Sequence, residues 1–231
     1  MEIDVSFDFR TDAGGRDPDS YSPTLRRYHK LLWSRTLPCG ETFELSDTAP
    51  RIYLYHRSSL GEFFLSSDSV IPTFAKWQSL KPITEKFPES EIEAFRSTSY
   101  TIGGMMIFPG NQISGKQTIN GARGFIRTIS DRFDLTLECI RRHYLNIDSP
   151  LALTLSRYDD FFELFEDFHG YVDFFLLNDL VNRKGEVKFF MPFEDFRPPT
   201  VPKDVDSYVE YRQRSIDFVE ARNNRIGLLA I

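Results

Sequence analysis

The stretch from Ile119 to Tyr144 constrains the fold of this chain most strongly, because it carries the clearest helix signal together with many charges. The apolar side chains that recur at helical spacing are Phe133, Leu137, Ile140 and Tyr144. Ser130 or Asp131 can serve as the N-cap, and acids precede bases, which suits the helix dipole. This pattern predicts an amphipathic helix whose charged face is solvated.

Five arginines in the same stretch favour a second interpretation, in which the helix and the chain before it form an anion site. The planar guanidinium forks of arginine match phosphate and carboxylate groups. On this reading we predict that Arg123, Arg132 and Arg142 bind phosphate.

A basic helix is predicted nearer the N-terminus, where Ser22 and Pro23 suit the N-cap and first helical position of a helix through about Ser34. Its basic residues alternate with aromatic residues, a pattern that nucleic-acid binders use. Arg27 and His29 are therefore added to the predicted phosphate-binding set. The simpler alternative is a solvated basic face with a buried Trp33.

His56 is the candidate catalytic residue, because it lies at the end of an apolar strand predicted over residues 51–57. Catalytic groups often project from strand ends, and the ordinary pKa of histidine suits proton transfer at neutral pH. A structural histidine bonded to a backbone carbonyl is the alternative.

The pattern of elements predicts an α+β fold in a single domain, residues 1–231, which is long enough to bury a sizeable core. Its mixed or antiparallel sheet would combine the alternating run Ile3–Phe9, a hairpin over residues 51–66 and a central strand after Gly103–Gly104. The two glycines indicate a bulge or a close backbone approach. A mostly helical C-terminal half would pack on this sheet. There we expect a helix from Ser149–Pro150 that ends at Gly170, a strand over residues 186–193, and a closing helix over residues 204–222.

Composition and charge exclude several classes of protein. Hydrophobic residues make up 41% of the chain and 22 of its 231 residues are phenylalanine, which indicates a folded, aromatic core. A net charge of −6 disfavours a generic polyanion binder. The sequence shows neither a signal peptide nor a membrane span, and its two cysteines lack metal spacing. We expect a cytoplasmic protein with reduced thiols.

Two groups of acidic residues have side chains that could bind a metal ion. Asp12, Asp17 and Asp19 occupy a polar loop, but turn aspartates that bond their own backbone explain that loop better. A second group, at helical spacing, is Asp159, Glu163 and Asp167, and a solvated acidic face explains it better than a hydrolytic metal site. No metal site is predicted.

The segments INGARG, DRFDLTLECIRRHY, YHKLLWS, YHRSSLGEFFLSSDS and ARNNRI resemble an uncharacterised family of bacterial and phage proteins, known as a domain of unknown function. The resemblance covers nearly the whole chain and implies a bacterial or phage setting. It implies no activity, cofactor or catalytic residue.

The favoured hypothesis is a protein that acts on or binds a phosphate-bearing substrate, a nucleotide or a nucleic acid, through an arginine-rich site. The alternative is a non-enzymatic protein that binds or blocks a host protein. The sequence leaves the cofactor unknown and does not decide whether the chain is an enzyme.

Overall fold

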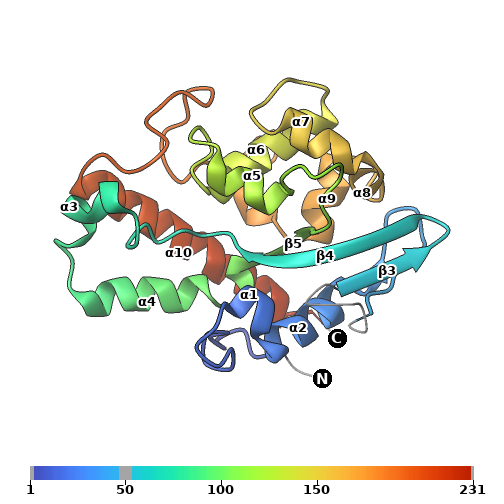
Figure 1. The fold of residues 1–231 in the computed structure, drawn as a ribbon, viewed down its shortest axis with the longest axis horizontal. Coiled ribbons are helices and arrows are strands. Elements are labelled where there is room, and N and C mark those ends of the chain that lie inside the picture. Colours follow the sequence, from blue (N-terminus) through green and yellow to red (C-terminus); the bar gives the residue numbers. More distant parts are fainter. Residues whose placement is uncertain (1–2, 47–53, 230–231) are drawn as a thin grey trace.

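The computed structural model describes residues 3–46 and 54–229, and it confirms the α+β prediction (Figure 1). A small three-stranded antiparallel sheet is surrounded by helices. The strands are β1 (Arg35–Thr36), β2 (Thr42–Phe43), β3 (Leu54–Ser58), β4 (Gly61–Ser69) and β5 (Met105–Pro109). The helices and 3₁₀ turns are α1 (Pro18–Tyr21), α2 (Pro23–Trp33), η1 (Gln78–Leu80), α3 (Lys81–Thr84), α4 (Glu89–Ser99), η2 (Ile102–Gly104), α5 (Ile119–Phe125), α6 (Phe133–Tyr144), α7 (Ala152–Leu155), η3 (Ser156–Tyr158), α8 (Asp159–Glu163), α9 (Phe168–Phe174), η4 (Asn178–Leu180) and α10 (Val205–Gly227).

The sheet has the order β3–β4–β5, and both strand pairs are antiparallel. The predicted hairpin is confirmed within the described residues, with His56 opposite Phe63; residues 51–53 of the predicted strand lie outside them. Every residue of β5 is buried. In Figure 1, α5–α9 lie above the sheet and α1 and α2 lie below it. The end of β4, which carries Asp68, thus emerges between these layers.

The N-terminal strand prediction is wrong, because residues 3–10 form turns and not a ladder. The side chain of Asp4 accepts the amide of Ser6 at 2.9 Å, and that of Asp8 accepts the amide of Arg10 at 3.0 Å. Aspartates that bond the backbone two residues ahead compete with strand pairing in this way. The apolar side of the pattern is still buried at Ile3 and Phe9.

The α6 helix confirms the predicted helix, but its start and its environment differ from the prediction. Arg132 occupies the N-cap position, while Ser130 and Asp131 have φ angles of +51° and +62°, which an N-cap does not adopt. The predicted solvated face is also wrong: Asp134 and Glu138 are buried. Chain segments beyond the helix cover this face, which periodicity within one helix does not reveal.

The C-terminal half is helical as predicted, but two boundaries and one strand differ. The helix expected from Ser149–Pro150 is divided into α7, η3 and α8, and Glu166 has a φ of +66°. Gly170 lies inside α9 and does not end a helix, since Asp167 caps a new one there. The strand expected over residues 186–193 is reduced to one isolated bridge at Val187.

The closing helix α10 is confirmed and is longer than predicted, with Asp204 and Ser207 forming a capping box. It packs against α4 and η2. Across this contact the Gly103 amide donates to the Asn223 side chain at 2.7 Å, and the Asn223 amide group donates to Thr101 at 2.8 Å. Asn223 therefore lies inside α10 and links this helix to the segment Thr101–Gly103. In the described part of the chain, no helix is both long and apolar enough to span a membrane.

We expect Gly103→Ala to destabilise the protein by at least about 2 kcal/mol. The close backbone approach predicted for this position is present: an added Cβ would lie 2.3 Å from the Val219 carbonyl oxygen, which is backbone of α10 and cannot move away cheaply. Urea unfolding measures the loss. Gly121→Ala is the matched control, because its nearest neighbour would be at 3.6 Å, and an equal loss there would contradict the packing explanation.

Candidate functional site

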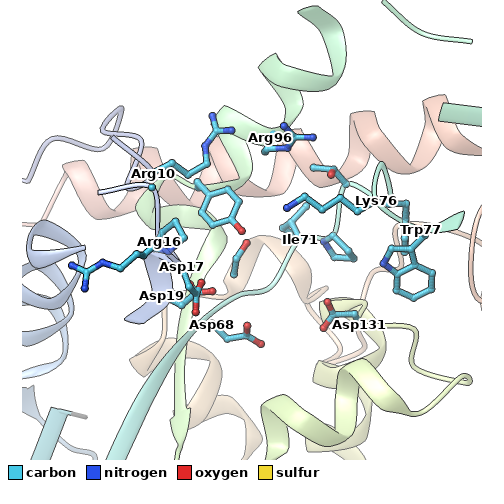
Figure 2. A pocket seen from close by; sticks show the side chains of 17 residues that line it. Arg10, Arg16, Asp17, Asp19, Asp68, Ile71, Lys76, Trp77, Arg96 and Asp131 are labelled. Atoms are coloured by element: carbon cyan, nitrogen blue, oxygen red, sulfur yellow. The ribbon is translucent and has the colours of Figure 1, made fainter. Parts of the chain in front are cut away.

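A polar cavity of about 660 Å³ lies where the N-terminal loop, the end of β4 and the end of α4 meet (Figure 2). Its walls come from five separate stretches of sequence. Four carboxylates line it, Asp17, Asp19, Asp68 and Asp131, together with four cations, Arg10, Arg16, Lys76 and Arg96. Tyr100 and Trp77 add aromatic surface. In Figure 2, Arg10, Arg96 and Lys76 lie above the cavity, while Asp19, Asp68 and Asp131 lie below it.

The carboxylate side of the cavity contains two carboxyl groups with raised pKa values, Asp19 of α1 and Asp68 of β4. Burial raises the pKa of Asp19 well above its ordinary value, and the charges of Asp68 and Asp17 raise it further. Burial also raises the pKa of Asp68 to about 7, although the Arg123 guanidinium opposes this. Two neighbouring carboxyl groups that cannot both ionise easily hold a proton at neutral pH.

Arg123 supports this side of the cavity from beneath. Its side chain is fully buried, and its Nη1 contacts Asp68 Oδ2 at 2.5 Å and Asp131 Oδ1 at 2.9 Å. Its Nη2 donates to the carbonyl oxygens of Asp131 and Val70, and its Nε donates to Thr136. All five N–H groups of the guanidinium thus have an acceptor on the chain. Arg123 organises the carboxylates and has no donor left for phosphate.

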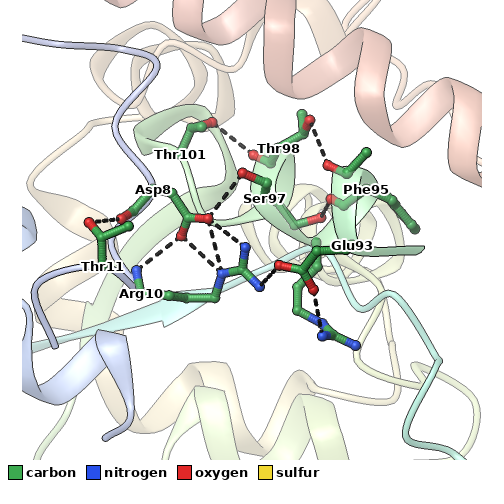
Figure 3. A network of polar contacts seen from close by, with 11 residues as sticks. Asp8, Arg10, Thr11, Glu93, Phe95, Ser97, Thr98 and Thr101 are labelled. Atoms are coloured by element: carbon green, nitrogen blue, oxygen red, sulfur yellow. Dashed lines mark hydrogen bonds and ion pairs between the residues drawn. The ribbon is translucent and has the colours of Figure 1, made fainter. Parts of the chain in front are cut away.

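Two cations of the opposite side are held in a network that joins the N-terminal loop to α4 (Figure 3). Asp8 accepts from the Arg10 guanidinium and from Ser97 Oγ at 3.0 Å. Glu93 bridges Arg10 at 2.7 Å and Arg96 at 2.9 Å. The hydrogen bonds that Arg10 donates to Asp8 raise the pKa of Arg10, so that cation stays charged. The network positions positive charge at the cavity before any ligand arrives.

The other two cations of the cavity, Arg16 and Lys76, have no carboxylate partner among the described residues. Both side chains belong to exposed residues, and Arg16 lies 3.9 Å from the ring centroid of Tyr21. Neither side chain is held in an ion pair by the described part of the chain.

The sequence-predicted phosphate ligands do not meet in one cleft. Arg132 is buried, with Asp134 as a bidentate partner and the Thr200 carbonyl at 3.1 Å. Arg142 pairs with Glu138 and Asp195 on α6 and the facing loop. Arg27 is exposed on α2 and lies 5.4 Å from the Tyr28 ring centroid. The arginine density of the segment thus serves mainly ion pairs within the fold, and phosphate binding by these residues stays a prediction.

The two predicted histidines are buried and fully bonded. His29 accepts from the Trp33 indole at 3.0 Å and contacts Ser67 Oγ at 2.9 Å, and burial lowers its pKa to about 3. His56 contacts the Glu44 carbonyl at 2.8 Å and Ser58 Oγ at 3.0 Å, and it packs on Phe43. Neither histidine lines the polar cavity. The structural alternative given for His56, a bond to a backbone carbonyl, describes its position.

No group of His, Cys, Asp or Glu side chains in residues 3–46 and 54–229 has the arrangement of a metal site. The acidic ladder Asp159, Glu163 and Asp167 is broken because Asp167 has left the helix to cap α9. The two cysteines are free, and burial raises the pKa of Cys139 to about 12.

Few of the residues that line the cavity can be predicted from the sequence. Its pattern predicts that Asp17 and Asp19 are turn aspartates, yet both line the cavity together with Asp68 from β4. The only sequence signal was the density of aspartates in the polar loop. Asp68 lies in a run of serines at a strand end, where nothing marks it as one of a pair.

The comparisons with known proteins agree with the resemblance drawn from the sequence. A model of the family of unknown function DUF6994 matches residues 3–226, nearly the whole chain. Neither curated proteins nor solved structures gave a match. The chain therefore belongs to the DUF6994 family of unknown function.

Proposed function

We propose that this protein binds a phosphate-bearing small molecule of the nucleotide class in the polar cavity. The observation that supports this most is the separation of charge across the cavity, with Arg10, Arg96 and Lys76 on one side and Asp19, Asp68 and Asp131 on the other. A nucleotide has the matching polarity, because its phosphates are anionic while its sugar and base offer hydrogen-bond donors. Tyr100 and Trp77 supply surfaces on which a base can stack.

The proposed anion site is the polar cavity and not the arginines of α5 and α6. Arg16 and Lys76 would contact phosphate directly, while Arg10 and Arg96 would add charge from their fixed positions. Asp68 and Asp131 would face the donors of the ligand. A cavity of about 660 Å³ falls within the range of small-molecule sites.

We expect adenosine monophosphate to bind more tightly than adenosine, and Lys76→Ala to weaken the binding of the nucleotide about 5- to 10-fold. This factor corresponds to roughly 1–1.4 kcal/mol, which is close to the contribution of one hydrogen bond to a charged group. Isothermal titration calorimetry measures both affinities. Arg16→Ala should act in the same direction.

Lys86→Ala is the matched control, because Lys86 is an exposed lysine close in sequence that does not line the cavity. Equal affinity for adenosine and its monophosphate would contradict the proposal, and so would an equal loss in the control variant.

The second candidate function is binding to a protein partner. Phe125, Leu145, Ile147 and Leu153 are exposed apolar side chains, and α7 contacts both α5 and α6. Exposed apolar side chains on adjoining elements favour an interface. If the calorimetric experiment finds no nucleotide binding, that result favours the binding of a protein partner as the function.

A further inference from the structure

The floor of the polar cavity contains an oxygen atom without a partner. Asp19 is half-buried as a residue, but its Oδ1 is buried and has no hydrogen-bond partner in the described part of the chain. Leaving a buried polar atom unbonded costs about 1–3 kcal/mol. Such an atom at the edge of a ligand-sized cavity suggests that a ligand completes its bonding.

The neighbours of Asp19 favour its neutral form. Asp68, from β4, and Asp17, at the start of α1, place negative charge beside it, while the charge of Arg123 from α5 opposes their effect only weakly. Arg123 forms ion pairs with both Asp68 and Asp131, so its positive charge mainly stabilises the ionised forms of those two groups. Tyr100, after α4, also faces the group, and burial together with the charge of Asp19 raises its pKa to about 12. Arg10, from the N-terminal loop, is held by Asp8 and Glu93.

We propose that Asp19 and Asp68 are the acid–base pair of this cavity: Asp19 presents a carboxylic acid to the ligand, and Asp68, held by Arg123, is its carboxylate partner. This rests on the proposed function, because the acceptor is a sugar oxygen of the bound nucleotide, on the side of the cavity that carries the carboxyl groups. The proton-bearing oxygen of Asp19 donates to that oxygen, and no bond other than the hydrogen bond is formed.

The first test needs no ligand. A group with a raised carboxyl pKa in the folded state binds a proton that the unfolded chain has lost, so its contribution to stability falls as pH rises from about 4 towards 7. Asp19→Asn removes this contribution. We therefore expect the melting temperature of the variant to exceed that of wild type at pH 8 and the difference to shrink at pH 5.

Asp206→Asn, an exposed aspartate of α10, is the control and should show no such pH-dependent difference. A carbon-13 NMR titration of the aspartate carboxyl carbons measures the pKa values of Asp19 and Asp68 directly in wild type. One carboxyl that stays protonated beyond pH 6 is the expected result. The inference is overturned if every carboxyl titrates below about pH 5, whether or not the variant folds.

The second test uses adenosine monophosphate between pH 7 and pH 8.5, where its phosphate has completed its own titration. Loss of a proton from the pair adds negative charge beside the ligand, so affinity should fall, by up to about tenfold per pH unit. Asp68→Asn should flatten this dependence, although it also weakens binding because Asp68 faces the donors of the ligand. Binding by wild type that does not change with pH refutes the acid–base pair and leaves the proposed function standing. If wild type binds no nucleotide and NMR still shows a protonated carboxyl, the proposed function and the contact with the ligand are refuted, but the protonated pair is not.

Discussion

Arg123→Met should destabilise the protein by about 3–5 kcal/mol, the range for removing one partner of a buried ion pair. Methionine fills much of the volume of the arginine, so the loss comes mainly from its charge and hydrogen bonds. Asp68 and Asp131 would lose their shared cation, and the Val70 carbonyl would lose its donor. Urea unfolding at pH 7 measures the change.

The same variant should become relatively more stable at acidic pH, because protonated aspartates no longer repel one another. Combining Arg123→Met with Asp68→Asn should restore part of the lost stability, since one uncompensated charge is gone. Arg123→Lys is the conservative control: it keeps the charge but lacks the planar fork, and we expect an intermediate loss. A loss below about 1 kcal/mol for Arg123→Met would contradict the role given to this residue.

Arg222→Met is the second substitution with a large expected effect, again about 3–5 kcal/mol. Arg222 is fully buried in α10 and donates to the carbonyl oxygens of Phe175, Gly103 and Met105 at 2.8–3.2 Å. Burial lowers its pKa to about 9, which leaves it charged at neutral pH. Without it, three carbonyl groups from two separate stretches of the chain lose a donor in the buried interior.

Arg225→Met is the matched control for this substitution. Arg225 lies one turn further along α10, is 40% exposed and pairs with Asp179. Exposed pairs contribute little, so we expect a loss below about 1 kcal/mol. Thermal or urea unfolding measures the free energy of unfolding of both variants, and the loss should be clearly larger for Arg222→Met. Equal losses would show that the carbonyl cluster around Arg222 does not need its cation.

Local patterns in the sequence determined several elements correctly. The Ser22–Pro23 start, the β3–β4 hairpin, the α6 stripe and the α10 helix all follow from signals within about a dozen residues. The glycines before β5 also gave a correct prediction of close packing. In each case the determining interaction is local, or the residue type itself limits the backbone.

The predicted sites depended on contacts that local patterns do not contain. Arginine density around α6 indicated an anion site, yet Arg123 and Arg132 meet carboxylates of their own chain in the interior. A guanidinium fork fits a protein carboxylate as well as a ligand phosphate. Residue type alone therefore cannot distinguish an internal ion pair from a binding site.

What the sequence by itself determined is the class of fold, most helices and the central hairpin, because these depend on periodicity, capping and turn chemistry. Only the tertiary structure decided where the candidate site lies. Asp19 and Asp68 are 49 positions apart in the numbering and become a coupled pair only when α1 packs on β4. Their chemistry arises from burial and from each other's charge, and both are properties of the folded chain.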